Sequence, residues 1–477
     1  MLASSRCLAV VALGCMLFAT RVASGETALP ADEGATGGET TVHASGRGAF
    51  LFPAANLDEA GRTQFALGNS FFRRNWVEAP SSTSARDGLG PLFIARSCGG
   101  CHDQGGRGAP PATIHGRNAE QPVALLLRLS VPGQDVHGGP RPESTYGDQL
   151  ANSAVRGVRA EGRIVIQYQE HRGRFIADGE PFSLREPSYR VVDAGYGPLD
   201  PHTMISPRIA QQLPGVGLLE AIPEADIVAL AQEQARRGEG IHGMANRVWD
   251  AVAQRMVLGR FGWKASVGSL AHQVAAAFNA DMGITSGVFP DESCTTIQTD
   301  CLAAPRGNHA MAPEIDDQTL ANVIFFQALL APLGRRDLRA AEVRRGKALF
   351  DAANCGICHH PRWVTGAPPY PAFSSAVLAG QTIYPYTDLL LHDMGEKLSD
   401  GRADFHASGR QWRTPPLWGI GLIPEVNGHQ YLLHDGRARG ILEAILWHGG
   451  EAEMSRRRVL EMSHADRRAL VRFVNSL

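Results

Sequence analysis

The sequence predicts a mainly α-helical protein built from two related modules, with a β-containing insertion in the first. Three observations support this fold class. The segment LFIARSCGGCH at 92–102 returns as LFDAANCGICH at 349–359, with identity at seven of eleven positions. Apolar residues recur at helical spacing over much of the chain, and short alternating runs are concentrated in residues 157–192. The length of 477 residues exceeds what one hydrophobic core usually serves.

The cysteine repeat sets the module boundaries that we predict. The first module covers residues 49–337, with the insertion at about 110–245, and the second covers residues 338–477. Residues 26–48 are rich in Gly, Thr and Ala and show no periodicity. We therefore expect a flexible leader there.

Periodicity also predicts the individual elements. Both cysteine units follow an apolar approach, GLGPLFIARS or AAEVRRGKALFDAAN, which we expect to be helical. Pro223 suits the first turn of a helix through ADIVALAQEQA, and the runs RIVIQYQ and GRFIADG in the insertion predict strands. Further helices are expected at about 268–280, 316–331, 338–353, 440–448 and 464–476.

The N-terminus has the layout of a secretory signal peptide, at residues 1–25. Arg6 supplies the positive charge, an apolar stretch follows from Cys7 to Ala19, and small residues precede Glu26. Export to the periplasm is expected. A lipid anchor at Cys15 is disfavoured, because Ala12 stands where such anchors usually carry leucine.

Composition narrows the range of partners. The formal net charge is −2, and only 20% of residues are charged, which argues against a nucleic-acid binder. No later segment offers the roughly twenty apolar residues that a membrane span needs. We expect neither nucleic acid nor a membrane-spanning helix.

Two of the cysteines that would remain after signal removal lie outside the repeat. Cys294 and Cys301, in ESCTTIQTDCLA, would close a short loop as a disulfide in an oxidising compartment. The alternative is two unrelated thiols.

The repeated Cys-x-x-Cys-His pentapeptide is typical of covalent c-type haem attachment. Two cysteines at this spacing can form thioethers with one haem, and the next residue is a histidine that can bind the iron. The sequence thus predicts two c-type haems, attached at Cys98 and Cys101 and at Cys355 and Cys358. The predicted proximal ligands are His102 and His359. A zinc site would need further Cys or His partners, and a thioredoxin-like redox pair would not need the histidine.

Several longer segments resemble the bacterial di-haem oxidoreductase family, whose members are labelled peroxidases or thiol oxidoreductases. The resemblance runs from about residue 50 to the C-terminus and implies two cytochrome-c-like haem modules. This family is distantly similar to the di-haem cytochrome c peroxidases and the MauG-type enzymes. The segments that carry it are DGLGPLFIARSCGGCH, GLLEAIPEADI, GRFGWKA, AFNADMGIT, GQTIYPYTDLLLHDMG, WRTPPLWGIGL and LLHDGRARGILEAILWHGGEAE.

The distant similarity implies roles for three residues in FGWKASVGSLAHQVAAAFNADMG. Trp263 matches a tryptophan that lies between the haems, and Gln273 and Asp281 match a glutamine and an acid on the peroxide side of the N-terminal haem. The match has departures, because Lys264 and Ala265 replace Asp and Gly, and the acid is Asp instead of Glu.

The general chemistry of peroxide cleavage supports the same candidate roles, but it does not single out these residues. Cleaving a peroxide bond requires a proton to move between its oxygens, so a carboxylate beside an open iron is an expected general acid or base. Asp281 is a candidate, and its alternative is a carboxylate at a helix end. Trp263 can equally be a core residue.

Several residues are candidates for the second axial ligand of each iron. The similar peroxidases carry Met-His-Asp-Gly-Arg and MauG-type proteins carry Tyr in place of the Met, whereas this chain has Leu433, which cannot bind iron. Met394 is favoured for the C-terminal haem, because thioether ligation raises the potential, and His434 is next. The remaining candidates are His392 and His448, and, for the first haem, a displaceable His115.

These observations predict an exported di-haem oxidoreductase of peroxidase type. Electrons from a small redox protein or cytochrome would enter at the C-terminal haem and reach the N-terminal haem, where a small oxidant such as peroxide is reduced. Three alternatives stay open: a pure electron carrier, haem-based oxidation of a thiol or protein, and a di-haem oxygenase.

Overall fold

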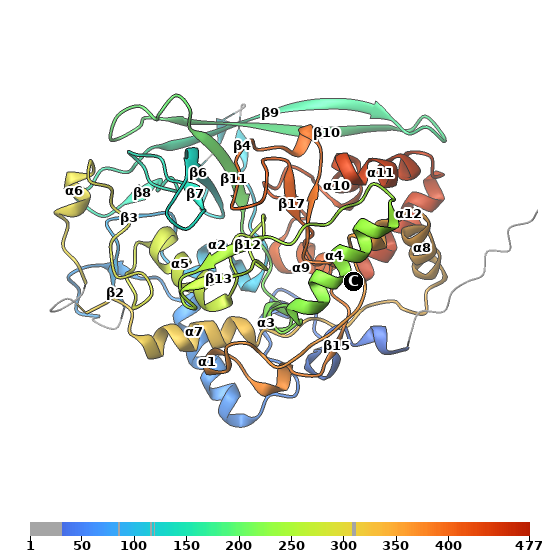
Figure 1. The fold of residues 1–477 in the computed structure, drawn as a ribbon, viewed down its shortest axis with the longest axis horizontal. Helices are drawn as coiled ribbons and strands as arrows, with labels where there is room; N and C mark the ends of the chain where they lie inside the picture. The colour runs from blue at the N-terminus through green and yellow to red at the C-terminus, as the bar shows by residue number, and fades with distance from the viewer. Residues whose placement is uncertain (1–30, 84–85, 115–116, 119, 308–311) are drawn as a thin grey trace, which may run out of the picture.

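The computed structural model combines helices with several small sheets (Figure 1). It describes residues 31–83, 86–114, 117–118, 120–307 and 312–477. The predicted signal peptide at 1–25 and His115 lie outside these residues. Helix makes up 33% and strand 19% of the structure, so the fold is mixed rather than mainly α. The prediction undercounted strands because most of them are too short to show an alternating pattern.

Twelve α-helices lie within the described residues. They are α1 (Glu59–Arg73), α2 (Cys98–Cys101), α3 (Val216–Glu220), α4 (Glu224–Arg237), α5 (Leu270–Met282), α6 (Thr299–Leu302), α7 (Asp317–Ala328), α8 (Ala341–Ala352), α9 (Ile423–Asn427), α10 (Ile441–Trp447), α11 (Glu453–Leu460) and α12 (His464–Ser476). The predicted helices after Pro223 and near 268–280, 316–331, 338–353, 440–448 and 464–476 are confirmed as α4, α5, α7, α8, α10 and α12.

The strands form one three-stranded sheet, ordered β11-β6-β7, and otherwise pairs. The longer ones are β6 (Leu125–Gln134), β9 (Arg163–Arg174), β10 (Pro181–Val192), β11 (Met204–Ile209), β12 (Arg247–Asp250) and β13 (Arg255–Leu258). The short ones are β1 (Val77–Glu78), β2 (Asp87–Leu89), β3 (Leu92–Phe93), β4 (Thr113–Ile114), β5 (Arg117–Asn118), β7 (Pro140–Arg141), β8 (Ser153–Ala154), β14 (Trp363–Val364), β15 (Thr382–Ile383), β16 (Leu391–Asp393) and β17 (Gln411–Arg413).

The approach to the first cysteine pair is not the predicted helix. GLGPLFIARS contributes to β2 and β3, because Gly88 has φ 99° and Pro91 follows directly after Gly90. A side chain at Gly90 would lie 2.1 Å from the Gly283 carbonyl oxygen, at the end of α5. The apolar residues of this segment are therefore spaced as they are because they are buried in an irregular extended stretch, and not because they lie on one face of a helix.

The insertion is dominated by one long antiparallel hairpin, β9–β10, which crosses above both halves of the molecule (Figure 1). RIVIQYQ lies in β9 as predicted. GRFIADG was also predicted as a strand, but only Gly173 and Arg174 belong to β9, and the remaining residues form the turn of the hairpin. The turn docks on the C-terminal half, where the Ile176 N–H donates to the Leu460 carbonyl at 2.9 Å and Arg467 donates to Asp178 at 2.8 Å.

The two halves share their hydrophobic cores. The core beneath α1, α5 and α7 includes Trp363 and Trp418 from the C-terminal half. The core around α8, α10 and α12 includes Phe50, Ile209 and Trp263 from the N-terminal half. Because each half completes the other's interior, their relative position is set by packing rather than by a linker.

Residues 31–48 are held against the body of the protein, in contrast to the flexible leader that composition predicted. The Glu33 carboxylate is buried at 2% exposure, where it accepts hydrogen bonds from Arg335 and from the Tyr386 hydroxyl. Composition misses this because one buried ion pair and a few backbone bonds anchor the segment.

Two further predictions concern a disulfide and membrane-spanning helices. The disulfide between Cys294 and Cys301 is confirmed, with a Cα–Cα distance of 5.8 Å. Among the described residues, no helix has both the length and the apolar character needed to span a bilayer.

Replacing the buried carboxylate should test how firmly residues 31–48 are anchored. We expect Glu33→Gln to lower the free energy of unfolding by about 3–5 kcal/mol, because Arg335 would remain buried without a counter-charge. Guanidinium unfolding of the holoprotein measures this. Glu461→Gln, in an exposed ion pair with Arg457, is the control and should cost less than about 1 kcal/mol. Equal losses in the two variants would contradict a buried anchor.

Candidate haem sites

The first cysteine pair lies on the wall of a cavity of about 720 Å³. Cys98 and Cys101 begin and end α2, and the Ser97 hydroxyl caps it by accepting the Gly100 N–H at 3.2 Å. His102 follows directly, and its Nδ1 donates to the Gln211 carbonyl at 2.6 Å. Burial lowers the pKa of His102, so the ring is neutral and its Nε2 keeps a lone pair.

The second cysteine pair repeats this arrangement around a cavity of about 180 Å³. Asn354, with φ 64°, ends the approach of α8 and starts a single 3₁₀ turn that carries Cys355 and leads to Cys358. The Nδ1 of His359 donates to the Tyr386 carbonyl at 3.1 Å. Burial lowers the pKa of His359 to about 4, which again leaves a neutral ring.

Both sites have the groups that covalent haem attachment requires. Cys98, Cys101, Cys355 and Cys358 are free thiols, and burial raises the pKa of Cys98 and of Cys355 to about 12. A buried neutral thiol suits a thioether better than a zinc thiolate. Each cavity thus offers two thiols, an imidazole whose Nδ1 is hydrogen-bonded to a backbone carbonyl, and walls that are largely apolar. These residues fit one c-type haem in each cavity.

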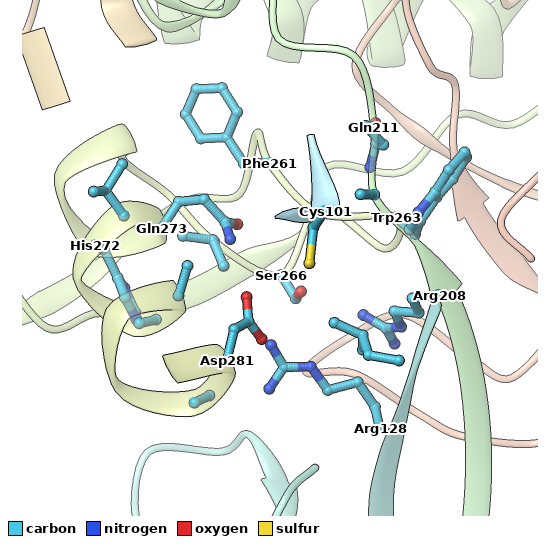
Figure 2. Close-up of a pocket in the computed structure, with 18 of the residues that line it drawn as sticks. Cys101, Arg128, Arg208, Gln211, Phe261, Trp263, Ser266, His272, Gln273 and Asp281 are labelled. Atoms are coloured by element: carbon cyan, nitrogen blue, oxygen red, sulfur yellow. The ribbon is translucent and has the colours of Figure 1, made fainter. Parts of the chain in front are cut away.

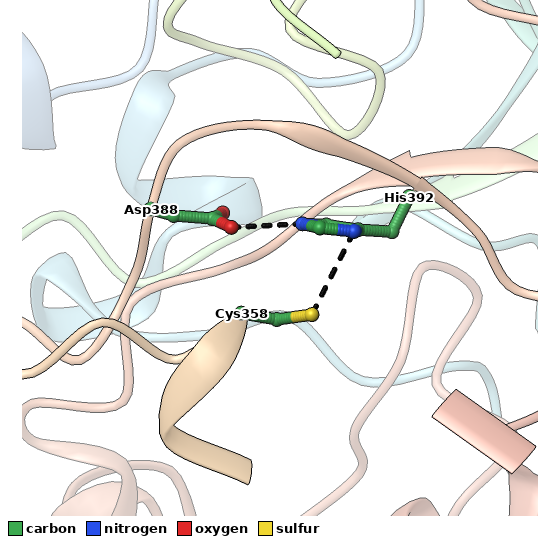
Figure 3. A group of neighbouring side chains, drawn as sticks. All are labelled: Cys358, Asp388 and His392. Atoms are coloured by element: carbon green, nitrogen blue, oxygen red, sulfur yellow. Dashed lines mark hydrogen bonds and ion pairs between the residues drawn. The ribbon is translucent and has the colours of Figure 1, made fainter. Parts of the chain in front are cut away.

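A cluster of Cys358, Asp388 and His392 also brings three possible metal ligands together (Figure 3). His392 is held between two carboxylates, Asp388 at 2.8 Å from Nε2 and Glu451 at 2.7 Å from Nδ1. Burial opposes protonation of His392, but the charges and hydrogen bonds of Asp388 and Cys358 together outweigh it and raise the pKa well above its usual value. The ring is therefore an imidazolium, which has no lone pair for a metal.

Trp263 lines both cavities. Its Nε1 donates to the Ile209 carbonyl at 2.8 Å, and its own carbonyl accepts the Arg413 N–H at 2.8 Å. The Arg107 guanidinium lies over the ring, 5.1 Å from a ring centroid. The ends of strand β11 and of β17 (Gln411–Arg413) thus hold Trp263 in one orientation.

Gln273 and Asp281 both come from α5 and face the larger cavity (Figure 2). The Asp281 carboxylate accepts a hydrogen bond from the Gln149 amide at 2.7 Å and points toward the Arg128 guanidinium. Burial raises the pKa of Asp281, and the Arg128 charge and the Gln149 bond counteract this only in part. A carboxyl in the last helical turn also meets the negative end of the helix dipole.

Helix α5 is held at its start by a buried acid. The Glu220 carboxylate, at the end of α3, accepts the Leu270 N–H at 2.7 Å, and the Ser269 hydroxyl caps the helix by accepting the His272 N–H at 3.1 Å. Burial raises the pKa of Glu220 to about 7. Its position sets where Gln273 and Asp281 enter the cavity.

The candidates for the second axial ligand of the C-terminal haem all line the smaller cavity. They are Met394, His434, His392 and His448, and Leu433 lines it too. His434 is stacked on Trp412, with ring centroids 3.8 Å apart and planes 11° from parallel. His448 follows α10, and its Nδ1 donates to the Ala444 carbonyl at 2.7 Å.

Sequence reasoning missed several charged residues around these cavities. Lys264, seen only as a departure from the similar peroxidases, is fully buried, donates to Asp400 at 2.9 Å and lies over the Trp412 ring. Arg128 and Gln149 come from the insertion and reach Asp281 only through folding. No local sequence signal marks Lys264 or Gln149, because their partners lie more than a hundred positions away; Arg128 pairs with Asp148, 20 positions along the chain.

Comparison with known proteins gives one positive finding. Residues 31–477 match the model of a family described as "Di-haem oxidoreductase, putative peroxidase". The matched region includes residues 31–48, in agreement with their packing in the structure. No curated protein and no solved structure matches the chain.

The buried Glu220 should make stability depend on pH. The unfolded carboxyl has a pKa near 4.5 and the folded one about 7, so the native state favours the protonated form. The protonated Glu220 carboxyl stabilises the folded protein at acidic pH, and this contribution is lost as the pH rises through the folded pKa. We expect Glu220→Gln to match the wild type at about pH 5 and to be more stable by up to about 3 kcal/mol at about pH 8. Chemical unfolding at the two pH values measures this, and a pH-independent difference would contradict it.

Proposed function

The chain belongs to the di-haem oxidoreductase family, and from this premise we propose that it is an exported di-haem c-type cytochrome that reduces a peroxide. Electrons would enter at the haem attached through Cys355 and Cys358 and reach the haem attached through Cys98 and Cys101. The donor would be a small redox protein or cytochrome. Together the two haems can supply two electrons, the number needed to convert one peroxide and two protons into two waters or alcohols.

The observation that carries this proposal is the difference between the two cavities. The cavity beside His102 has about 720 Å³, whereas the one beside His359 has about 180 Å³. The larger one leaves room for a small substrate as well as a cofactor, and it contains the carboxyl of Asp281. A pure electron carrier needs neither the extra space nor an acid there.

Asp281 is suited to move a proton beside the substrate. Burial is the main cause of its raised pKa, which moves toward neutral pH. A carboxyl with such a pKa can both accept and donate a proton. The Gln149 amide holds the carboxylate in place, and Arg128 limits the shift. Gln273, two turns earlier on α5, can orient the substrate by hydrogen bonding.

Trp263 is suited to conduct electrons, because it is the aromatic side chain that lines both cavities among the residues described. The hydrogen bond from Nε1 to Ile209 and the backbone bond from Arg413 hold the ring against motion. A ring held in one position would keep the electronic coupling between the two haems constant.

Export is supported by two independent features. Residues 1–25 have the pattern of a signal peptide, and Cys294 and Cys301 form a disulfide of the kind found in oxidising compartments. With this pair oxidised, the free cysteines among the described residues are the four of the attachment motifs. Chemistry that uses a protein thiol is therefore disfavoured.

Peroxide reduction with a reduced cytochrome as donor tests the proposal. The holoprotein with two haems should turn over peroxide well above free haem, and Asp281→Asn should lose about 100-fold or more in kcat/KM. Activity of the wild type should fall as pH drops through the raised pKa of Asp281, because the base becomes protonated, and this acidic limb should vanish in the variant.

Asp226→Asn, at an exposed carboxylate of α4, is the matched control and should behave as wild type. Haem content is compared in all three proteins. Absence of turnover in fully loaded wild type, together with purely low-spin iron in electron paramagnetic resonance, would indicate an electron carrier instead.

Trp263→Phe should slow electron transfer between the two sites without reducing haem content. Stopped-flow absorbance after mixing the fully reduced protein with peroxide separates the oxidation of the two haems. The matched control is Trp249→Phe, which changes a tryptophan that lines only the larger cavity. If both variants slowed the reaction equally, the position of Trp263 between the cavities would have no special role.

A further inference from the structure

The smaller cavity contains a second histidine with the hydrogen bonding expected of an iron ligand. Nδ1 of His359 faces the Tyr386 carbonyl at 3.1 Å, and Nδ1 of His448 faces the Ala444 carbonyl at 2.7 Å. A carbonyl oxygen only accepts, so each Nδ1 carries the proton. In a neutral ring the lone pair is then on Nε2, the arrangement that ligating histidines usually show.

His448 and His359 line the same cavity, the smaller of the two. Burial lowers the pKa of His448, and the Ala444 carbonyl offsets this only in part. Among the described residues, Nε2 of His448 has no hydrogen-bond partner.

The position of His448 follows from its helix. It comes directly after α10 (Ile441–Trp447), and its N–H donates to the Ile445 carbonyl at 3.1 Å. Its Nδ1 is therefore free to satisfy the Ala444 carbonyl, one of the acceptors that a helix C-terminus leaves unpaired. The hydrogen bond from Nδ1 to the Ala444 carbonyl, at the end of the helix, also selects the tautomer that has its proton on Nδ1.

The other candidates line the same cavity but lack a backbone carbonyl that would hold the proton on Nδ1. His434 is stacked on Trp412, and its Nε2 lies 3.7 Å from an oxygen of Asp435. His392 has a carboxylate on each ring nitrogen. Met394 packs against the apolar core around α8, α10 and α12, where a thioether serves as an ordinary hydrophobic group.

We propose that His448, and not Met394, is the second axial ligand of the iron bound by His359, so that the C-terminal haem is a bis-histidine centre. This rests on the di-haem assignment above but not on peroxide as the substrate. Such a haem has both axial positions filled and is closed to peroxide. It also lacks the thioether that raises the potential of His/Met haems, so its donor must be a stronger reductant.

The test uses the purified holoprotein with both haems attached. Near-infrared magnetic circular dichroism of the wild type should show the charge-transfer band of bis-imidazole ligation, without a thioether–iron band. In electron paramagnetic resonance, His448→Ala should convert one haem per protein to high spin, and added imidazole should restore the low-spin signal. Met394→Leu, the matched control, should leave both spectra as in wild type.

A second variant covers the case in which His448→Ala does not load haem. His448→Met should load haem, show a thioether–iron band and have a raised C-terminal haem potential. A thioether–iron band in the wild type, or its loss in Met394→Leu, would overturn the proposal, as would an unchanged spectrum in His448→Ala. Failure of peroxide turnover with the bis-imidazole band present would count against the proposed reaction and leave His448 as the ligand.

Discussion

The hydrogen bonds from His102 and His359 to backbone carbonyls are the constraint on which the two sites depend. A histidine can hold iron through Nε2 only if something fixes its other nitrogen, and the acceptors here are the carbonyls of Gln211 and Tyr386. Gln211 lies 109 positions from His102 and follows β11 of the insertion. Much of the fold serves to bring these carbonyls to the histidines.

The segment at Tyr386 shows how that placement is maintained. Tyr386 has φ 55°, a left-handed conformation that costs a non-glycine residue free energy. Its hydroxyl donates to the buried Glu33, which also pairs with Arg335. The docked N-terminal segment therefore holds the carbonyl that orients His359, which connects residues far from the cavity with the histidine proposed to bind its iron.

The junction between the sites concentrates buried positive charge. Arg107 lies over Trp263, and burial lowers the pKa of Arg107 to about 9 and that of Arg413 to about 10, so both remain protonated at neutral pH. Arg107 donates to the carbonyls of Tyr431 and Leu433 at 2.7 and 2.6 Å. The Arg107 cation over the indole opposes loss of an electron from its ring, which in the proposed electron path would favour conduction over storage of a radical.

The sequence by itself determined the local features: the two attachment motifs, the long amphipathic helices and the disulfide. These depend on residues close together in the chain, so spacing is sufficient to find them. Only the tertiary structure decided that Trp263 lines both cavities, that Asp281 meets Gln149 and Arg128, and that residues 31–48 are docked. Leu433 looked informative by analogy and Met394 by the chemistry of thioether ligation, whereas His448 stands out among the candidates only when its hydrogen bond to Ala444 is visible. The physical reason is that a buried group acquires its pKa, tautomer and partners from long-range contacts, and no pattern along the chain encodes them.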